Sequence, residues 1–237
     1  MEKQSTTIIT ENIIMHNLTA SLPFVQAMDA FFPIGAYTMS NGMETYVQKQ
    51  IVKDKESLFS FVKNYISILT FTELGFAAHA AMGAEVEMLD GLCGASKVPK
   101  EVREGSRKLC SRFLKAESFI GNFKELTEYQ KKIDKGSCEG YYCIAIGLLM
   151  RQLDMPIEEG LLLYGYNQIS AMVNHGVKLV PLRQLEGQWV LHQTMVLLEQ
   201  AVQKAMASDI LELGASGAAY DMRCMEHETL AARMYLS

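Results

Sequence analysis

The chain has 237 residues, a net charge of −5 and 49% hydrophobic residues, a composition typical of a folded globular protein with a sizeable core. Its negative charge argues against binding to nucleic acid through bulk positive charge, and no uncharged run is long enough to span a bilayer. Five irregularly spaced cysteines without a preceding secretory signal indicate free thiols and a cytoplasmic protein.

The N-terminal region is expected to be flexible before the first helices begin. Residues 1–17 mix Thr, Asn, Ile and charged residues without a period, so they are predicted to form a mobile segment. Ser21 is a suitable cap for a first helix, which Pro33 and Gly35 then break. A second helix is expected over about residues 40–50.

Periodic apolar residues predict a series of helices through the middle of the chain. Asp54 can cap a helix whose apolar stripe continues to about Leu89. This is long for a globular helix, so a break is expected near Gly75 or Gly83. Two later helices open at prolines, which the first helical turn favours. These further helices are expected over residues 99–120, 124–133, 139–154, 156–180 and 182–207.

The C-terminal residues are predicted to be a joint followed by a tail. Small residues dominate 213–219, which indicates flexibility, and 220–237 has an amphipathic pattern. The predicted fold is therefore all-α, a single-domain bundle of about eight to ten helices over residues 18–212, with flexible N- and C-terminal segments. The tail over 213–237 is expected to bind a partner.

Motifs for catalysis, nucleotides and metals were not found. The sequence has neither a phosphate-binding GxxxxGK[ST] loop nor GxGxxG. His227 and Glu228 resemble the start of HExxH, but Ala231 stands at the second histidine. The spacing of Cys138 and Cys143 is not a zinc motif. We therefore predict a protein that is not an enzyme, with no catalytic, cofactor-binding or metal-binding residue. The remaining scattered histidines are interpreted as surface or satisfied core residues: His79, His175 and His192.

The stretch 97–115 is rich in basic residues. On a helix, Lys100, Arg103 and Arg107 would line one side. Such a face is either merely solvated or a docking surface for an acidic protein, and the sequence leaves both interpretations open.

Three stretches carry a resemblance to a known family. Residues 29–46, DAFFPIGAYTMSNGMETY, resemble the pattern D-x-x-FP-x-G-x-[FY]-x-H-S-x-G-[LM]-E. Residues 177–188, VKLVPLRQLEGQ, are similar to V-[KR]-x-VPLGQ-x-x-GQ. Residues 221–237, DMRCMEHETLAARMYLS, resemble D-I-x-x-M-x-HE-x-L-x-x-R-[LM]-[FY]-x-S. Together, in this order, they are similar to the UreF family of urease accessory proteins.

The resemblance implies which residues contact partners, and where this chain departs from the family. Met39 and Cys138 stand where the family has histidines, and Arg183 replaces a glycine, so no metal role is transferred to these positions. Pro33 and Gly35 suggest a shaped surface more than a catalytic cleft. We predict partner-contacting side chains within the three motifs: Pro33, Gly35, Tyr37, Glu44, Tyr46, Gln184, Gln188, His227, Glu228, Arg233 and Tyr235.

The resemblance also implies a function. UreF-like proteins are all-α homodimers that bind UreD (also called UreH) and the GTPase UreG, dock on apo-urease, and couple GTP hydrolysis to nickel transfer. The expected role is a non-enzymatic scaffold. Two alternatives remain: a helical enzyme or ligand-binding protein with a buried pocket lined by Met, Tyr and His, and a generic helical interaction protein.

The tail has an apolar face that needs to be buried. Isolated helices of this length are marginal in water, so the face should pack either on the body of the same chain or on a partner. Arg233 and Tyr235 suit a desolvated interface. We predict that the tail orders on the UreD-like partner.

Overall fold

The computed structural model describes residues 21–236, and all regular structure in that range is helical, which confirms the all-α prediction. Residues 21–27 are helical. The predicted flexible segment over 1–17 lies outside the described residues. The α-helices that follow are α2 Met43–Gln48, α3 Lys55–Phe71, α4 Glu73–Ala81, α5 Val86–Ser96, α6 Lys100–Ala116, α7 Lys124–Asp134, α8 Tyr142–Gln152, α9 Ile157–Leu179, α10 Gln184–Gln193, α11 Met195–Ala207 and α12 Ala218–His227.

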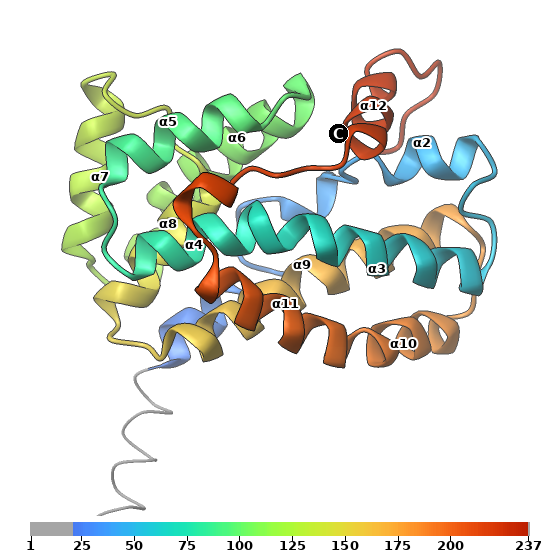
Figure 1. Ribbon diagram of the computed structural model, residues 1–237, viewed down its shortest axis with the longest axis horizontal. Coiled ribbons are helices and arrows are strands. Elements are labelled where there is room, and N and C mark those ends of the chain that lie inside the picture. The colour runs from blue at the N-terminus through green and yellow to red at the C-terminus, as the bar shows by residue number, and fades with distance from the viewer. Residues whose placement is uncertain (1–20, 237) are drawn as a thin grey trace, which may run out of the picture.

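The helices form one bundle, and α3 and α4 are its central pair. In Figure 1, α3 and α4 cross the middle, α10 and α11 lie below them, and α5, α6 and α7 lie above on the left. Helix α12 and the C-terminal end sit at the upper right, beside α2. Three short 3-10 helices complete the described chain: η1 Ala36–Thr38, η2 Glu117–Phe119 and η3 Ile210–Glu212.

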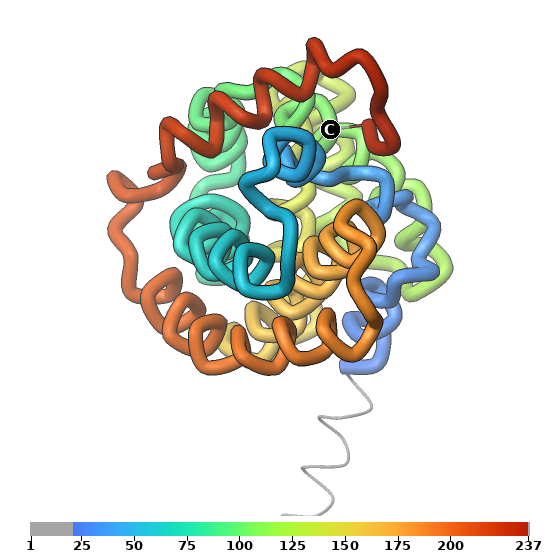
Figure 2. The backbone as a smooth tube through the Cα atoms, turned by 90° about the vertical axis from the view of Figure 1, so that its right-hand side faces the viewer, coloured from blue at the N-terminus to red at the C-terminus, as the bar shows by residue number. Residues whose placement is uncertain are grey.

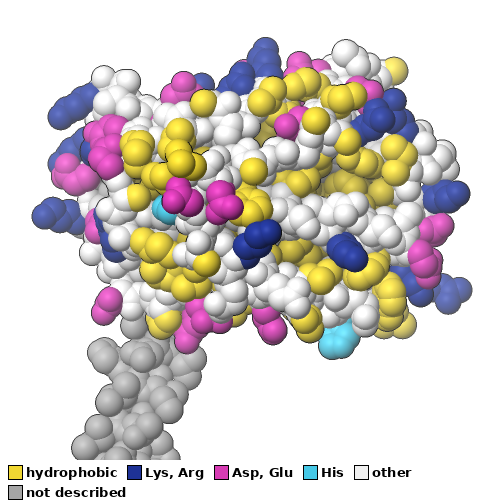
Figure 3. Space-filling model, viewed as in Figure 1, with side chains coloured by type: hydrophobic (Ala, Val, Ile, Leu, Met, Phe, Trp, Pro, Cys, Tyr) yellow, Lys and Arg dark blue, Asp and Glu magenta, His cyan; other side chains and the backbone are white. Residues whose placement is uncertain are grey.

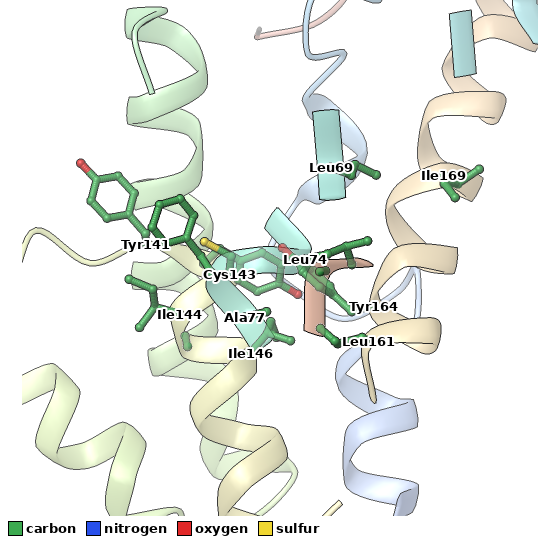
Figure 4. Close-up of a cluster of buried hydrophobic side chains, with 14 of the residues drawn as sticks. Leu69, Leu74, Ala77, Tyr141, Cys143, Ile144, Ile146, Leu161, Tyr164 and Ile169 are labelled. Atoms are coloured by element: carbon green, nitrogen blue, oxygen red, sulfur yellow. The ribbon is translucent and has the colours of Figure 1, made fainter. Parts of the chain in front are cut away.

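Helix α8 lies in the core because its sequence is apolar on every side. All of its residues from Tyr142 to Met150 are buried. Gly147 lets α8 approach α4 closely, since a Cβ there would collide with the backbone carbonyl of Ala77. Around this contact, side chains from α3, α4, α8 and α9 meet; they include Leu69, Leu74, Ile144, Ile146, Leu161, Tyr164 and Ile169 (Figure 4).

The long helix expected after Asp54 begins as predicted and is divided twice. The Asp54 carboxylate accepts a hydrogen bond from the Ser57 backbone N–H at 2.8 Å, which caps α3. The first break falls at Thr72, whose φ of −105° and ψ of −99° are not helical; Gly75 continues α4. The second break falls at Gly83, with φ +92°. These divisions explain why the described residues hold slightly more helices than expected.

The segment between α11 and α12 lies along the body. The Gly214 backbone N–H donates to the carbonyl of Phe71 at 2.7 Å, and the Leu213 side chain packs beside Gly75. Helix α12 then lies against α2 and α6 (Figures 1 and 2). Of the two candidates for burying the tail, the structure therefore shows the body of the same chain.

The fold presents no membrane-spanning element in its described part: none of the helices within residues 21–236 combines the length and the apolarity needed to cross a bilayer. All five cysteines are buried and reduced, in agreement with the thiols expected from their spacing. The sulfur atoms of Cys93 and Cys143 lie 3.7 Å apart.

Candidate interaction site around the C-terminal segment

Residues of the first and third motifs meet where α12 crosses the start of α2. Gly42 precedes α2 with a φ of +80°, and a Cβ there would lie 2.8 Å from the Cys224 sulfur. Only glycine suits both the backbone angle and this close approach. Two residues later, Glu44 lies in the first turn of α2, where the helix dipole favours a carboxylate.

Glu44 is a buried acceptor, with 4% of its surface exposed. One carboxylate oxygen accepts the backbone N–H of Met234 at 2.7 Å. The other accepts the backbone N–H of Tyr235 and faces His227 Nε2, each at 3.2 Å. Because burial of an unpaired carboxylate is costly, these three contacts are what allow Glu44 to lie beneath the C-terminal residues.

His227 connects this carboxylate to a second one. Its ring is fully buried, and Nδ1 lies 2.6 Å from Glu101 Oε2 on α6. The other Glu101 oxygen accepts from Arg233 Nη1 at 2.8 Å. An imidazolium can donate to both carboxylates, whereas a neutral ring can donate to one only. The chain Glu44–His227–Glu101–Arg233 therefore links α2, α12, α6 and the C-terminal residues; we call it the clasp.

Beyond the clasp, Tyr235 joins the C-terminus to the first motif. Its ring is buried and lies 4.5 Å from that of His175 on α9. Burial lowers the pKa of His175 to about 4, so the ring is neutral near pH 7, and Nε2–H donates to the Tyr37 carbonyl at 3.0 Å. The Leu236 N–H donates to the Thr38 carbonyl at 2.9 Å. The last residues thus pack along η1.

The predicted residues around Pro33 form a separate, open feature. Gly35 has a φ of +74°, as the predicted turn requires, and its neighbour Ile34 accepts a hydrogen bond from Arg112 Nη1 at 3.0 Å. Pro33 is exposed, as is the Tyr37 side chain at 66%. These residues line an open notch together with Phe31.

The remaining predicted residues lie apart from the clasp. Gln184 and Gln188 are exposed on α10 and line a shallow groove against α9. Glu228 is exposed next to His227, and its side chain forms no hydrogen bond or ion pair with the described residues. Tyr46 packs against Phe61, with ring centroids 4.8 Å apart. The eleven predicted residues therefore divide among the clasp, the notch and the α9–α10 groove, with Tyr235 next to the clasp and with Tyr46 and Glu228 outside all three.

Two residues of the site were not identified from the sequence. Glu101 appeared only as an acidic residue within a basic stretch, and nothing in its neighbours marks it as the partner of His227. His175 was interpreted as a surface or core histidine, and it is indeed buried. Its contact with Tyr37 and Tyr235 depends on segments far away in sequence, so no local pattern indicates it.

The three departures from the family pattern have structural roles here. Met39 is buried beside Gly105. Cys138 is buried, and this burial raises the pKa of its thiol to about 12. Arg183 precedes α10, and its backbone N–H donates to Glu186 at 2.8 Å. Among residues 21–236, no three His, Cys, Asp or Glu side chains are arranged to hold one metal ion.

A partly open pocket of about 80 Å³ is lined by residues of α3, α6, α9 and α12, among others. Glu73 and Lys97 form a buried ion pair at its wall. Burial by itself lowers the pKa of Lys97, but the nearby Glu73 carboxylate raises it by more. The pKa therefore ends above its ordinary value, and the lysine stays charged. Other lining residues are Met39, Asn41, Tyr65, Ser106, Tyr142, Met172 and His175.

The fold and this site define an all-helical protein in which the polar residues of the clasp hold the C-terminal segment on the body of the chain. The family model of UreF matches residues 52–195. "Urease accessory protein UreF" of Actinobacillus pleuropneumoniae serotype 5b (strain L20) is 36% identical over 217 residues, which cover 89% of this chain and 96% of the relative. That of Haemophilus influenzae (strain PittGG) is 34% identical over 228 residues, covering 93% and 97%. The chain belongs to the UreF family of urease accessory proteins.

Proposed function

We propose that this chain is a non-enzymatic scaffold in urease maturation. In this proposal it bridges a UreD/UreH-like accessory protein and the GTPase UreG, and it couples GTP hydrolysis to nickel insertion into apo-urease. It acts as a homodimer in the cytoplasm. Family membership supports the accessory role, and the finer assignments to partners extend it.

The clasp is the observation that carries the proposal. Four of the predicted partner-contacting residues, Glu44, His227, Arg233 and Tyr235, meet in one place. Their inward contacts fix the backbone of the last residues. The outer side chains are left exposed: Met234 at 67%, Leu236 at 57% and Arg233 also to solvent. Exposed apolar side chains on a held backbone form a preorganised contact surface.

Substitutions of these outer side chains test the scaffold role without disturbing the fold. Met234→Asp with Leu236→Asp places charges on an interface that partner binding would desolvate. The double variant is expected to lose co-purification with the UreD-like protein, and urease activation with it. The matched control is Leu211→Asp, whose side chain is 90% exposed in η3, away from the clasp. Full co-purification of the double variant contradicts the assignment of this surface.

The ligand-binding alternative has one observation in its favour, the pocket whose lining includes Met, Tyr and His side chains. Its volume of about 80 Å³ suits a few water molecules, whereas small-molecule sites usually occupy several hundred Å³. The geometry therefore favours the scaffold. A rise in melting temperature with a candidate cofactor would instead support a ligand site, because tight ligands stabilise the folded state by mass action.

The proposal also predicts that the isolated chain does not hydrolyse GTP, since its sequence lacks a phosphate-binding loop. Phosphate release from GTP, measured with pure protein before and after addition of UreG, separates the two activities. Turnover in the absence of UreG contradicts the proposal.

A further inference from the structure

The exposed face of α6 differs from the rest of the molecule in its charge. Two basic side chains of this region are engaged within the chain: Lys97 is buried with Glu73, and the half-buried Arg103 donates from Nη1 to the Lys97 carbonyl at 2.7 Å. Dark blue side chains stand at the upper edge of the molecule, over α6 (Figure 3). The exposed basic residues of this helix are Lys100, Arg107, Lys108, Arg112 and Lys115, and we call them the α6 basic face.

Most of these cations have no carboxylate partner. The side chains of Lys100, Lys108 and Lys115 form no ion pair or hydrogen bond with any residue in the described range 21–236, and Arg107 has one exposed ion pair, to Glu139, at 3.6 Å. The whole chain carries a net charge of −5. A face that concentrates unpaired positive charge on a negative protein attracts acidic surfaces.

An apolar notch adjoins the C-terminal end of this face. Phe119 in η2 is 75% exposed and Phe31 is 95% exposed, and both line the notch with Pro33. Figure 2 shows the two segments side by side, the blue chain after residue 21 and the green chain after α6. Arg112 lines the neighbouring hollow described above, which shares Phe31 and Pro33 with this one; the two hollows together are called the notch from here on.

The notch has a fixed shape. The Phe31 backbone N–H donates to the Asp29 carboxylate at 2.7 Å, and Arg112 donates to the Ile34 carbonyl at 3.0 Å. The first bond closes the loop between the first helix and η1 on itself, and the second holds that loop against α6. Two large aromatic side chains are rarely left this exposed next to each other on a protein surface. Aromatic residues beside an arginine are typical of protein-binding hot spots.

We propose that the α6 basic face and the notch together dock an acidic segment of a protein partner, with one apolar side chain of that segment entering between Phe31 and Phe119. The basic residues steer and orient the segment, and the notch supplies the desolvated anchor. The α6 basic face begins beside Glu101 of the clasp, but the notch lies beyond the other end of α6 and none of its lining residues belongs to the clasp, so the proposal does not rest on the scaffold role.

The charges favour a protein over a membrane or a nucleic acid. Asp29, Glu104 and Glu139 are interspersed with the basic residues, and each would face the phosphates of lipid or nucleic acid unfavourably. An anionic membrane also suits a flat amphipathic face, whereas this apolar region is a hollow framed by two rings. A protein segment can place its carboxylates between the acidic positions.

A synthetic acidic peptide with a single central Leu tests the proposal, with fluorescence anisotropy on the full-length chain. The expected result is binding that weakens at high salt and weakens again when the Leu is replaced by Ser. Lys108→Glu with Lys115→Glu should reduce affinity about tenfold, since each exposed pair contributes up to roughly 1 kcal/mol and reversal adds repulsion. Phe119→Ser should reduce it about fivefold through loss of apolar burial.

Matched controls make the outcome decisive. Lys63→Glu with Lys135→Glu changes two exposed lysines elsewhere by the same total charge and should leave affinity within about twofold if the charges act locally. Equal weakening by both double variants overturns the proposal, as does a peptide that ignores the Leu-to-Ser change. Sedimentation with phosphatidylserine vesicles that depends on Lys108 and Lys115, without peptide binding, would replace the protein partner by a membrane.

Discussion

Two buried carboxylates hold distant segments of this chain, and they do so in different surroundings. Asp90 on α5 accepts the Tyr129 hydroxyl at 2.6 Å and the backbone N–H groups of Glu139 and Gly140 at 2.6 and 3.0 Å. Glu44 on α2 likewise accepts two consecutive backbone N–H groups, those of Met234 and Tyr235. Each carboxylate fixes the backbone of a segment that has no helix of its own.

The difference between them lies in what surrounds the bonds. The Asp90 bonds are enclosed by α5, α7 and α8, and Tyr129 is itself buried and donates to this acid while accepting the Tyr141 N–H. The Glu44 bonds lead outward through His227 and Glu101 to Arg233, which is 41% exposed. A buried polar network is part of the cooperative core, whereas one that ends in solvent can open locally. We therefore expect Asp90 to support the whole fold and Glu44 to support the C-terminal residues.

Removal of the Asp90 carboxylate should have the largest effect. Asp90→Ala leaves the buried Tyr129 phenol, the buried Gly140 N–H and the partly buried Glu139 N–H without their acceptor. Each fully buried group left this way costs about 1–3 kcal/mol. We expect the free energy of unfolding to fall by about 3 kcal/mol or more, measured by urea denaturation. Asp134→Ala, at an exposed position on α7, is the control and should change stability little. Equal losses in both variants would remove Asp90 from this role.

His175 packs against Tyr235 in the C-terminal region and should make stability depend on pH. Its pKa is about 4 when folded, below the ordinary 6.5, because of burial. The unfolded chain therefore binds the proton more readily, and the stabilisation present above pH 6.5 is lost as pH falls towards 4. Between pH 7 and pH 5 this amounts to about 2 kcal/mol.

The measurement compares the native chain with His175→Gln, which keeps a side-chain N–H for the Tyr37 carbonyl and does not titrate. The difference in unfolding free energy between the two proteins should shrink from pH 7 to pH 5. A difference that stays constant over this range would show that His175 has the same proton affinity in both states.

Glu44→Gln should loosen the C-terminal residues and leave the body intact. The amide has one acceptor oxygen in place of two, so it cannot serve both backbone N–H groups and His227. We expect hydrogen exchange at residues 229–236 to accelerate about tenfold, equivalent to 1.4 kcal/mol of lost protection. Exchange in α4 and α8 should not change. Glu228→Gln is the matched control next to the clasp, and faster exchange across the whole chain would contradict a local opening.

Arg233→Ala should have the smallest effect on stability. Its bond to Glu101 is partly exposed, and such ion pairs contribute at most about 1 kcal/mol. The melting temperature should therefore stay nearly unchanged, while binding of the UreD-like protein weakens if the proposed contact surface is correct. Arg223→Ala, which removes a local ion pair to Glu226 on α12, is the control. A large drop in melting temperature with Arg233→Ala would instead make this residue part of the core.

The sequence was most informative where a structural signal is local. The Asp54 cap, the proline-led starts of α6 and α9 and the periodic apolar residues each involve neighbours within a turn or two, so the all-α fold followed from them. The division at Thr72 was not predicted. The Thr72 side chain donates a hydrogen bond to the Ile68 carbonyl, and threonines inside unbroken helices can form the same bond, so a threonine at this position does not indicate a helix end.

The site shows where such reasoning ends. Motif positions marked Glu44, His227 and Arg233 as important, yet they did not show that these residues contact one another. His227 is 183 residues from Glu44 and 126 from Glu101. The local sequence does not indicate which distant carboxylate a histidine will contact, because that contact depends on how α2, α6 and α12 pack.

The sequence by itself determined that the chain is helical, where most helices begin, and which family its motifs belong to, because helix periodicity and capping are properties of adjacent residues. Only the tertiary structure decided that the C-terminal segment lies on its own body, that Glu101 joins the clasp, and that Lys97 is buried while Lys108 faces solvent. Those outcomes depend on the packing of helices that are distant in sequence, and burial of a charged side chain is possible only where that packing supplies a partner.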